Sequence, residues 1–244
     1  MNQALRLSVV VPVKNEEGNI GPLVAEIADA CLPLGAFEVI VVNDGSNDGT
    51  TSALQKLAAE HAWFRHLTHA ESCGQSAAVR TGVRAARAAV AATLDGDGQN
   101  DPKFIPAMLE KLEQGGPEIG LVQGQRLGRK DTGFKKFQSR VANAVRSRVL
   151  RDDTRDTGCG LKLFRRDAYL ALPYFDALHR FMPALVKREG YRVALLDVVD
   201  RPRMSGVSNY GFFDRLWVGI LDLAGVWWLI RRRRKVPKAT EASS

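Results

Sequence analysis

Two acidic turns, each directly after a short apolar run, constrain the fold of this chain more than any other feature. The first turn lies in VIVVNDGSNDGT at residues 39–50, and the second lies in AATLDGDGQNDP at residues 91–102. Strands of a mostly parallel sheet present ligand-binding groups at their carboxyl ends. We therefore expect the two turns to meet at one crevice, where their carboxylates would bind a cation or a cationic edge.

The apolar pattern around these turns predicts strands that alternate with helices. Residues 7–13 are apolar and β-branched, too short for a helix, and indicate a buried first strand. Residues 16–33 follow with apolar positions at helical spacing. Further strands are expected at 37–42, 65–68, 91–94, 119–123 and 192–199, and further helices at 48–62, 75–90 and 104–114. This order is typical of an α/β fold with a mostly parallel sheet and helices on both faces.

Length and composition favour one large domain with a C-terminal appendage. The 244 residues are 45% apolar, which is enough for a full core. We expect a main domain over 1–211, an amphipathic and basic helix over 212–235, and a disordered tail over 236–244. The three cysteines show no C-x-x-C spacing, and the N-terminal apolar run is shorter than a signal-peptide core. A cytoplasmic protein is therefore expected.

The second acidic turn has the composition of a divalent metal site. Asp95, Asp97 and Gln99 alternate as hard oxygen ligands in a glycine-rich turn, which suits Mg²⁺ or Mn²⁺ held against phosphate. An EF-hand is excluded, because Asn100 stands where glycine is needed and Pro106 where a bidentate glutamate is needed. The chain also lacks a G-x-G-x-x-G turn after the first strand and a P-loop. A metal would therefore neutralise the phosphate charge.

Five segments, in this order, resemble the family 2 glycosyltransferases: PVKNEE, VVNDGSNDGT, LDGDGQNDP, GQR at 124–126 and RPRMSGVSNYG at 201–211. Within that family the likeness is to the dolichyl- and polyprenyl-phosphate mannose synthases and their bacterial relatives, and it covers roughly residues 7–211. The resemblance implies a nucleotide-diphospho-sugar transferase fold of the GT-A type. It also implies metal-dependent transfer of a sugar from a GDP- or UDP-sugar to a polyprenyl or dolichyl phosphate, with inversion.

The same resemblance assigns roles to individual residues. Pro12, Asn15, Glu16 and Asp44 would line the pocket for the base and ribose, and Arg203 would bind the donor. Asp95, Asp97 and Gln99 would hold Mg²⁺ or Mn²⁺, with Asp95 also on the donor side. Arg126, Lys135 and Ser139 would bind the lipid phosphate, so that Asp95, Asp97 and Arg126 form the catalytic set. Asn209 departs from the pattern, since lysine is usual there, and its role is left open.

Two basic segments stand out, and the second suggests contact with a membrane. Residues 126–151 carry nine Lys or Arg and apolar positions at helical spacing, which predicts either a basic helix beside the site or a solvated helix face. Residues 216–230 are apolar, contain three tryptophans and precede RRRRK. This run is too short to span a bilayer and fits a helix in the headgroup region, although a helix packed on the core is the alternative. We expect a peripheral protein on the cytoplasmic face.

Two other functions stay open at this stage. A family 2 enzyme with a polysaccharide or soluble acceptor would work without lipid. A nucleic-acid-binding protein would suit the net charge of +8, but no recognised nucleic-acid motif is present. We interpret His61, His66 and His69 as structural. The sugar, the nucleotide, the lipid length and the oligomeric state are not determined by the sequence.

Overall fold

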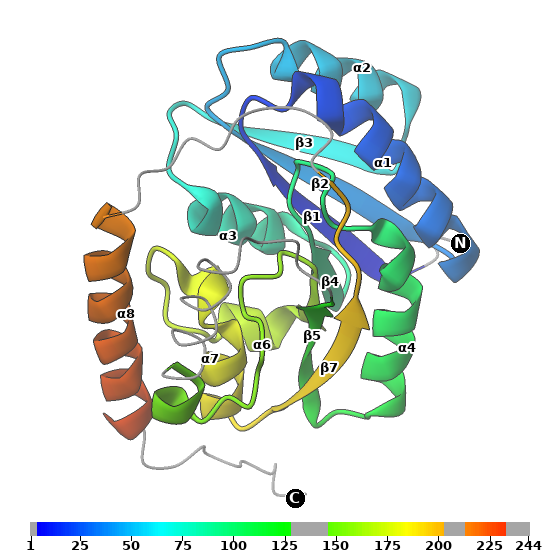
Figure 1. Cartoon of the computed structure of the whole chain (residues 1–244). Helices are drawn as coiled ribbons and strands as arrows, with labels where there is room; N and C mark the ends of the chain where they lie inside the picture. The colour runs from blue at the N-terminus through cyan, green and yellow to red at the C-terminus, as the bar shows by residue number, and fades with distance from the viewer. Residues whose placement is uncertain (1–3, 128–145, 203–212, 233–244) are drawn as a thin grey trace, which may run out of the picture.

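The computed structural model describes residues 4–127, 146–202 and 213–232, with side chains from residue 219 onward in the last range. Its centre is a seven-stranded sheet in the order β3-β2-β1-β4-β6-β5-β7 (Figure 1). The strands are β1 (Leu7–Val13), β2 (Phe37–Asp44), β3 (Phe64–His69), β4 (Val90–Thr93), β5 (Ile119–Arg126), β6 (Lys162–Arg165) and β7 (Arg192–Val198). Every residue of β1 and β2 is buried, as expected for central strands covered on both faces.

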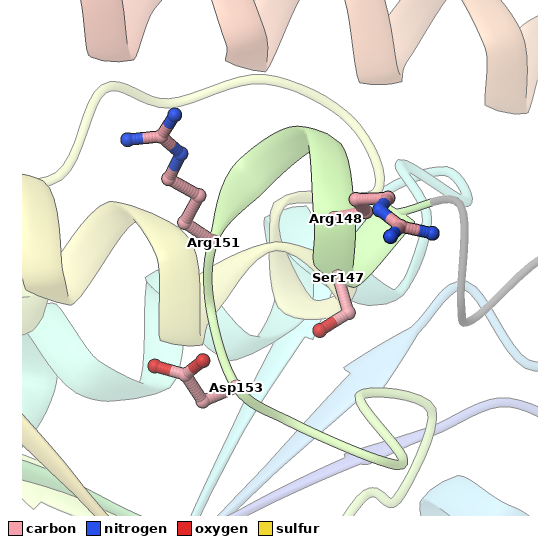
Figure 2. A pocket seen from close by; sticks show the side chains of 4 residues that line it. All are labelled: Ser147, Arg148, Arg151 and Asp153. Carbon is pink, nitrogen blue, oxygen red and sulfur yellow. The ribbon is translucent and has the colours of Figure 1, made fainter.

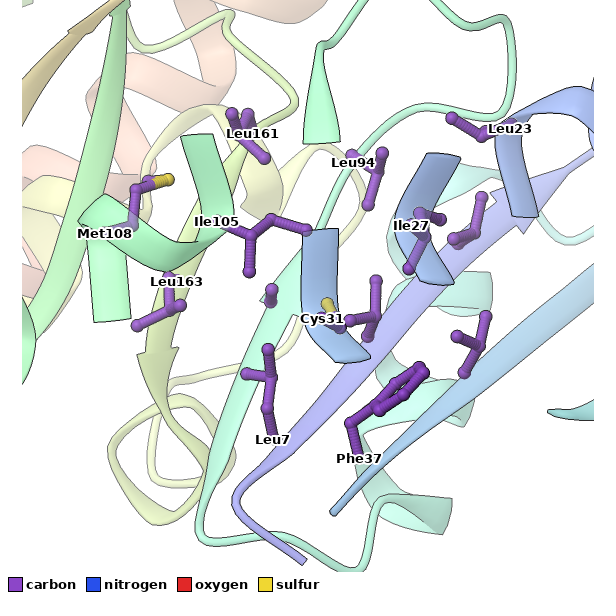
Figure 3. Close-up of a cluster of buried hydrophobic side chains, with 14 of the residues drawn as sticks. Leu7, Leu23, Ile27, Cys31, Phe37, Leu94, Ile105, Met108, Leu161 and Leu163 are labelled. Atoms are coloured by element: carbon purple, nitrogen blue, oxygen red, sulfur yellow. The ribbon is translucent and has the colours of Figure 1, made fainter. Parts of the chain in front are cut away.

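Helices cover both faces of the sheet. They are α1 (Glu17–Cys31), α2 (Thr50–Glu60), α3 (Gln75–Ala85), α4 (Ile105–Gln114), α6 (Arg166–Leu170), α7 (Met182–Arg188) and α8 (Phe213–Arg232). Short 3-10 turns occupy Leu32–Leu34, Pro102–Phe104 and Leu178–Arg180. One core cluster packs α1 and α4 on the strands, with Ile27 and Ile105 at its centre (Figure 3). A second cluster packs α3, α6, α7 and α8 on the other face. The predicted α/β fold is confirmed.

Within the described sheet, β6 alone runs antiparallel to both of its neighbours. Lys162 at its start lies opposite Thr93 near the end of β4, and opposite Gln123 of β5. Residues just before β6 therefore reach the same edge as residues just after the parallel strands. The sequence did not predict β6, because a run of four residues is too short to show a period.

The expected basic helix over 126–151 is wrong at its start. β5 continues to Arg126, which pairs with Val198 of β7, and Leu127 also bonds to the backbone of that strand. Residues 128–145 lie outside the described part of the chain. Residues 146–150 are helical, as expected.

Helix α8 has one packed face and one exposed apolar face. Leu223, Val226 and Ile230 belong to the second core cluster, and Arg188 of α7 donates a hydrogen bond to the Leu229 carbonyl at 3.1 Å. The exposed side chains are Ile220, Leu221, Trp227 and Trp228. The core-packed alternative describes one face of this helix, and the interfacial interpretation stays a prediction. No helix in the described ranges has both the length and the apolarity needed to cross a membrane.

Two glycines inside helices should respond in opposite ways to replacement by alanine. A Cβ at Gly82 of α3 would lie 2.4 Å from a methyl of Val10, so Gly82→Ala should overpack the core and lower the free energy of unfolding by about 1–3 kcal/mol. A Cβ at Gly225 of α8 would meet no atom within 4 Å. Gly225→Ala should therefore raise that free energy by about 0.5–1 kcal/mol. Urea unfolding measures both, and equal stability of the two variants would contradict the packing described.

Candidate functional site

The second acidic turn begins at Asp95, just after β4, and its first carboxylate is held on several sides. The Asp95 backbone N–H donates to Oδ1 of Asn100 at 3.1 Å, and the Asp95 Oδ1 accepts from Nε2 of Gln75 at 2.7 Å. A Cβ added at Gly160 would lie only 2.3 Å from the Asp95 Oδ2 and 2.5 Å from the Asn100 Oδ1. Residue 160 must therefore be glycine for Asp95 to keep this position.

The electrostatics of this turn favour a bound cation. Burial, with the negative charge of Asp97, raises the pKa of Asp95 to about 6, while Lys162 and Arg126 oppose the shift. Asp97 lies in a tight turn, where its Oδ1 accepts from the backbone N–H of Gln99 at 3.1 Å. Two mutually repelling carboxylates followed by an amide oxygen form a hard donor set, which suits Mg²⁺ or Mn²⁺. The residues present thus fit the predicted metal.

Arg126 lies at the end of β5 and is held by two carboxylates. Its Nε and Nη2 donate to Asp156 at 2.5 and 2.9 Å, and its Nη1 donates to Asp200 at 3.3 Å. Burial by itself would lower the pKa of Arg126, but the hydrogen bond and the charge of Asp156 raise it overall. Asp200 also accepts from Nδ2 of Asn100 at 3.3 Å. Arg126 is therefore connected to the second acidic turn through Asp200 and Asn100.

The first acidic turn is anchored by Asp44, at the end of β2. Its carboxylate accepts hydrogen bonds from the His69 ring at 2.7 Å, the Ser72 hydroxyl at 2.8 Å, and the backbone N–H groups of Cys73 and Gly74 at 2.8 and 2.9 Å. Burial would raise the pKa of Asp44, but these hydrogen bonds lower it overall. Asp44 therefore fixes the loop that leads into α3.

Asp44, His69 and Cys73 also bring their ligand atoms within 4.8 Å of one another, as a small metal site would. The donors around Asp44 already occupy its two oxygens, so the group acts as a hydrogen-bonded anchor in this structure. His69 was expected to be structural, and its hydrogen bond to Asp44 places it closer to the candidate site than its sequence position indicated.

The turn after β1 lies against the first acidic turn. Asn15 has a φ of 57°, its N–H donates to the Ser46 hydroxyl at 2.9 Å, and its Oδ1 accepts from the Asn47 N–H at 2.9 Å. The Glu16 N–H donates to the Thr50 hydroxyl at 2.9 Å. Pro12 is buried. The predicted residues Pro12, Asn15 and Glu16 thus lie at the same edge of the sheet as Asp44.

Three predicted residues, Lys135, Ser139 and Arg203, lie outside the described part of the chain, as does Asn209. Their predicted roles stay predictions.

Several residues of the site were missed from the sequence. Lys162 is buried at the start of β6, where its Nζ donates to the Cys159 carbonyl, and burial lowers its pKa. The His179 Nδ1 lies 2.9 Å from the hydroxyl of Ser76, one residue after Gln75. Gln75, Asn100, Asp156 and Asp200 were missed as well. A signal did exist for Asp156, Gly160 and Lys162, because DTGCGLK places charged residues and two glycines directly before the apolar pair Leu163 and Phe164.

A hollow lies beside the helical segment at 146–150. It has a volume of about 590 Å³ and is lined by Ser147, Arg148, Arg151 and Asp153. Figure 2 shows the guanidinium groups of Arg148 and Arg151 on opposite sides of this segment. Asp153 is paired with Lys187 of α7 at 2.6 Å. Of the predicted site residues that the structure describes, none lines this pocket.

Comparisons with known proteins agree on one family. The model of the family described as glycosyl transferase family 2 matches residues 8–172. Dodecaprenyl-phosphate galacturonate synthase of Rhizobium johnstonii is 37% identical over 238 residues, which cover 96% of this chain and 70% of that protein. Undecaprenyl-phosphate 4-deoxy-4-formamido-L-arabinose transferase of Aeromonas hydrophila is 33% identical over 207 residues, which cover 84% of this chain and 63% of that protein.

Solved structures share the fold at lower identity. The mannosyltransferase PcManGT from Pyrobaculum calidifontis, in complex with GDP-Man and Mn²⁺, has a TM-score of 0.68 and 22% identity, covering 97% of this chain and 67% of that one. Glucosyl-3-phosphoglycerate synthase from Mycobacterium tuberculosis, in complex with Mn²⁺, UDP and phosphoglyceric acid, has a TM-score of 0.67 and 18% identity, covering 95% and 80%. These likenesses establish the GT-A type of fold.

The buried His179 should make stability depend on pH. Burial, with the charges of Lys162 and Arg180, lowers the pKa of His179 from 6.5 to about 3. As the pH falls below 6.5 the unfolded chain takes up this proton and the folded chain does not. The free energy of unfolding should therefore fall by up to about 1.4 kcal/mol per pH unit, down to pH 3. Urea unfolding between pH 7.5 and 5 should show a smaller slope for His179→Gln, and an unchanged slope would contradict this contribution.

Proposed function

This chain belongs to glycosyl transferase family 2, and we propose that it transfers a sugar from a GDP- or UDP-sugar to a polyprenyl or dolichyl phosphate. One observation carries this proposal: Asp95 and Asp97 lie at the carboxyl edge of the parallel strands, and hydrogen bonds from the Asp95 backbone N–H through Asn100 and Asp200 connect their turn to the guanidinium of Arg126. Such an edge offers a cation to a nucleoside diphosphate and a positive group to a second phosphate. The relatives named as polyprenyl-phosphate sugar transferases support the same acceptor.

On the donor side, Asp95, Asp97 and Gln99 would hold Mg²⁺ or Mn²⁺. When bound, this ion supplies positive charge that stabilises the departing nucleoside diphosphate. Gln75 orients the Asp95 carboxylate by donating to it, and Asn100 holds the Asp95 backbone by accepting from its N–H.

The base and ribose would lie against Pro12, Asn15, Glu16 and Asp44, at the neighbouring strand ends. Arg203 would add charge at the diphosphate. This placement follows from the shared edge of β1, β2 and β4, whose carboxyl ends are adjacent in the sheet.

On the acceptor side, Arg126, Lys135 and Ser139 would bind the lipid phosphate. A phosphate oxygen forms the new bond to the anomeric carbon, and the bond from that carbon to the donor phosphate oxygen breaks. The nucleoside diphosphate leaves with the electron pair, and attack from the opposite side inverts the anomeric centre. A phosphate monoester is largely ionised near pH 7, so this step requires no strong general base.

We further propose that the protein lies on the cytoplasmic face of a membrane, with α8 in the headgroup region. Leu221 and Trp228 are 70% and 53% exposed, although both are large and apolar. Arg231 lies over the ring of Trp227 with 4.3 Å between guanidinium carbon and ring centroid, and Arg232 lies 5.7 Å from Trp228. Paired aromatic and cationic groups suit the boundary between anionic headgroups and acyl chains.

Transfer should depend on Asp97 and on a lipid acceptor. Purified protein is incubated with Mn²⁺ or Mg²⁺ and a panel of UDP- and GDP-sugars, with and without polyprenyl phosphate, and mass spectrometry follows the lipid extract. One donor should give a sugar-phosphate lipid. Asp97→Ala should reduce the product to background because the metal loses a ligand, whereas Asp29→Ala, an exposed carboxylate on α1, should not.

The outcomes separate the functions that the sequence left open. If nucleotide is released only when a soluble or polysaccharide acceptor is added, that acceptor replaces the lipid phosphate in the proposed function. Wild-type activity and metal dependence in Asp97→Ala would contradict the metal site. Absence of turnover, with salt-sensitive binding to oligonucleotides, would favour the nucleic-acid-binding alternative.

Vesicle binding should depend on the outer face of α8. The double variant Trp227→Ser/Trp228→Ser should bind vesicles of phosphatidylcholine and phosphatidylglycerol about tenfold more weakly, because it loses apolar burial. Leu32→Ser is a matched control, since Leu32 is 60% exposed but lies at the end of α1. Co-sedimentation measures both, and equal loss in the two variants would contradict docking through α8.

A further inference from the structure

Asn100 and Asp200 form a polar bridge between two parts of the site that do not follow each other in sequence or in the sheet. Asn100 lies in the turn after β4, and Asp200 lies two residues after β7. Asn100 is only 3% exposed, and the side chain of Asp200 is 22% exposed. Their hydrogen bond, from Nδ2 of Asn100 to Oδ1 of Asp200, measures 3.3 Å.

Each member of this pair uses its second polar atom on a different functional group. The Asn100 Oδ1 accepts from the Asp95 N–H at 3.1 Å, so the amide holds the start of the acidic turn. The Asp200 Oδ2 accepts from Nη1 of Arg126 at 3.3 Å, so the carboxylate holds the guanidinium. The pair therefore joins the candidate metal ligand to the candidate phosphate-binding arginine.

The backbone beside Asp200 strengthens the same connection. The Arg201 N–H donates to the Gln99 carbonyl at 2.9 Å, and the Arg201 guanidinium is paired with Glu26 of α1 at 2.6 and 3.0 Å. The end of β7 is thus attached to the acidic turn by its backbone as well as by the Asn100 side chain. The Asn100–Asp200 bond lies inside an ordered frame.

We propose that Asn100 and Asp200 are positioning residues that fix the metal-binding turn and Arg126 relative to each other. In this role neither residue contacts the sugar or the reacting atoms. The proposal rests on the proposed function for the identity of the two bound groups. Its physical basis is the direction of the hydrogen bonds, since Asp200 is acceptor to both neighbours and Asn100 is donor to one and acceptor to the other.

This pattern can be broken in two ways and repaired in one. In Asp200→Asn, the new amide N–H₂ faces a hydrogen-bond donor in either orientation: Nδ2 of Asn100 in one and Nη1 of Arg126 in the other. Asn100→Asp puts a carboxylate against the Asp200 carboxylate. The double variant Asn100→Asp/Asp200→Asn restores every bond, because residue 100 then accepts from both sides, while residue 200 donates to it and accepts from Arg126.

The experiment measures binding without turnover. Mn²⁺ is titrated into the 244-residue chain in the presence of GDP or UDP, whichever nucleotide the wild type binds. Electron paramagnetic resonance follows the binding of the ion. Each single variant should bind Mn²⁺ about 10- to 100-fold more weakly, as expected when a ligand loses its outer support. The double variant should recover most of that affinity. Asp197→Asn, near the end of β7 and paired with Arg155 at an exposed position, should match the wild type.

The outcomes decide the proposal independently of the acceptor. Wild-type affinity in both single variants overturns it, and so does a folded double variant that binds Mn²⁺ as weakly as the single ones. If a single variant fails to fold, recovery in the double variant still supports the proposal. If the wild type binds Mn²⁺ normally but gives no lipid product, the proposed function is contradicted. The Mn²⁺ affinities of the variants then still decide whether Asn100 and Asp200 are positioning residues.

Discussion

Carboxylates gathered at one partly buried edge of the sheet govern the structure around them. Four of them approach each other there: Asp95, Asp97, Asp156 and Asp200. Buried charges are costly unless they are paired and hydrogen-bonded. Arg126 pairs with two of these groups, Lys162 adds a buried positive charge, and Gln75 and Asn100 supply amide donors. Most of the unusual features of this edge, including a glycine that touches Asp95, serve to hold these charges in place.

The half of the site that follows parallel strands could be predicted from the sequence. Asp44 and Asp95 each stand at the end of a recognisable apolar run, so their convergence follows from the direction of the strands, whereas Arg126 was predicted from the GQR motif of the family resemblance. Asp156 and Gly160 could not be placed in this way. They precede a four-residue strand that runs in the opposite direction, and neither its length nor its direction has a sequence signal. Asp200 depends on the pairing of β7 with β5, which joins distant parts of the chain.

Helix α8 carries apolar residues both on the side that packs on the core and on the side that stays exposed. Its apolar residues lie on several sides of the helix instead of forming one stripe. Val226 and its neighbours pack on α7, whereas the side chains of Trp227 and Trp228 are exposed. A sequence pattern indicates how much apolar surface a helix carries. How much of that surface the fold covers depends on tertiary contacts that the pattern does not contain.

The reversed strand β6 has a further consequence for the size of what can bind. It lies between β4, which leads to Asp95, and β5, which ends at Arg126. Two steps between neighbouring strands place those strand ends about 10 Å apart. In the proposed reaction, the sheet therefore sets the distance between the donor diphosphate at Asp95 and the lipid phosphate at Arg126. The sugar has to fit between them. A change of sugar would have to be accommodated by side chains, because the backbone spacing is set by the hydrogen bonds of the sheet.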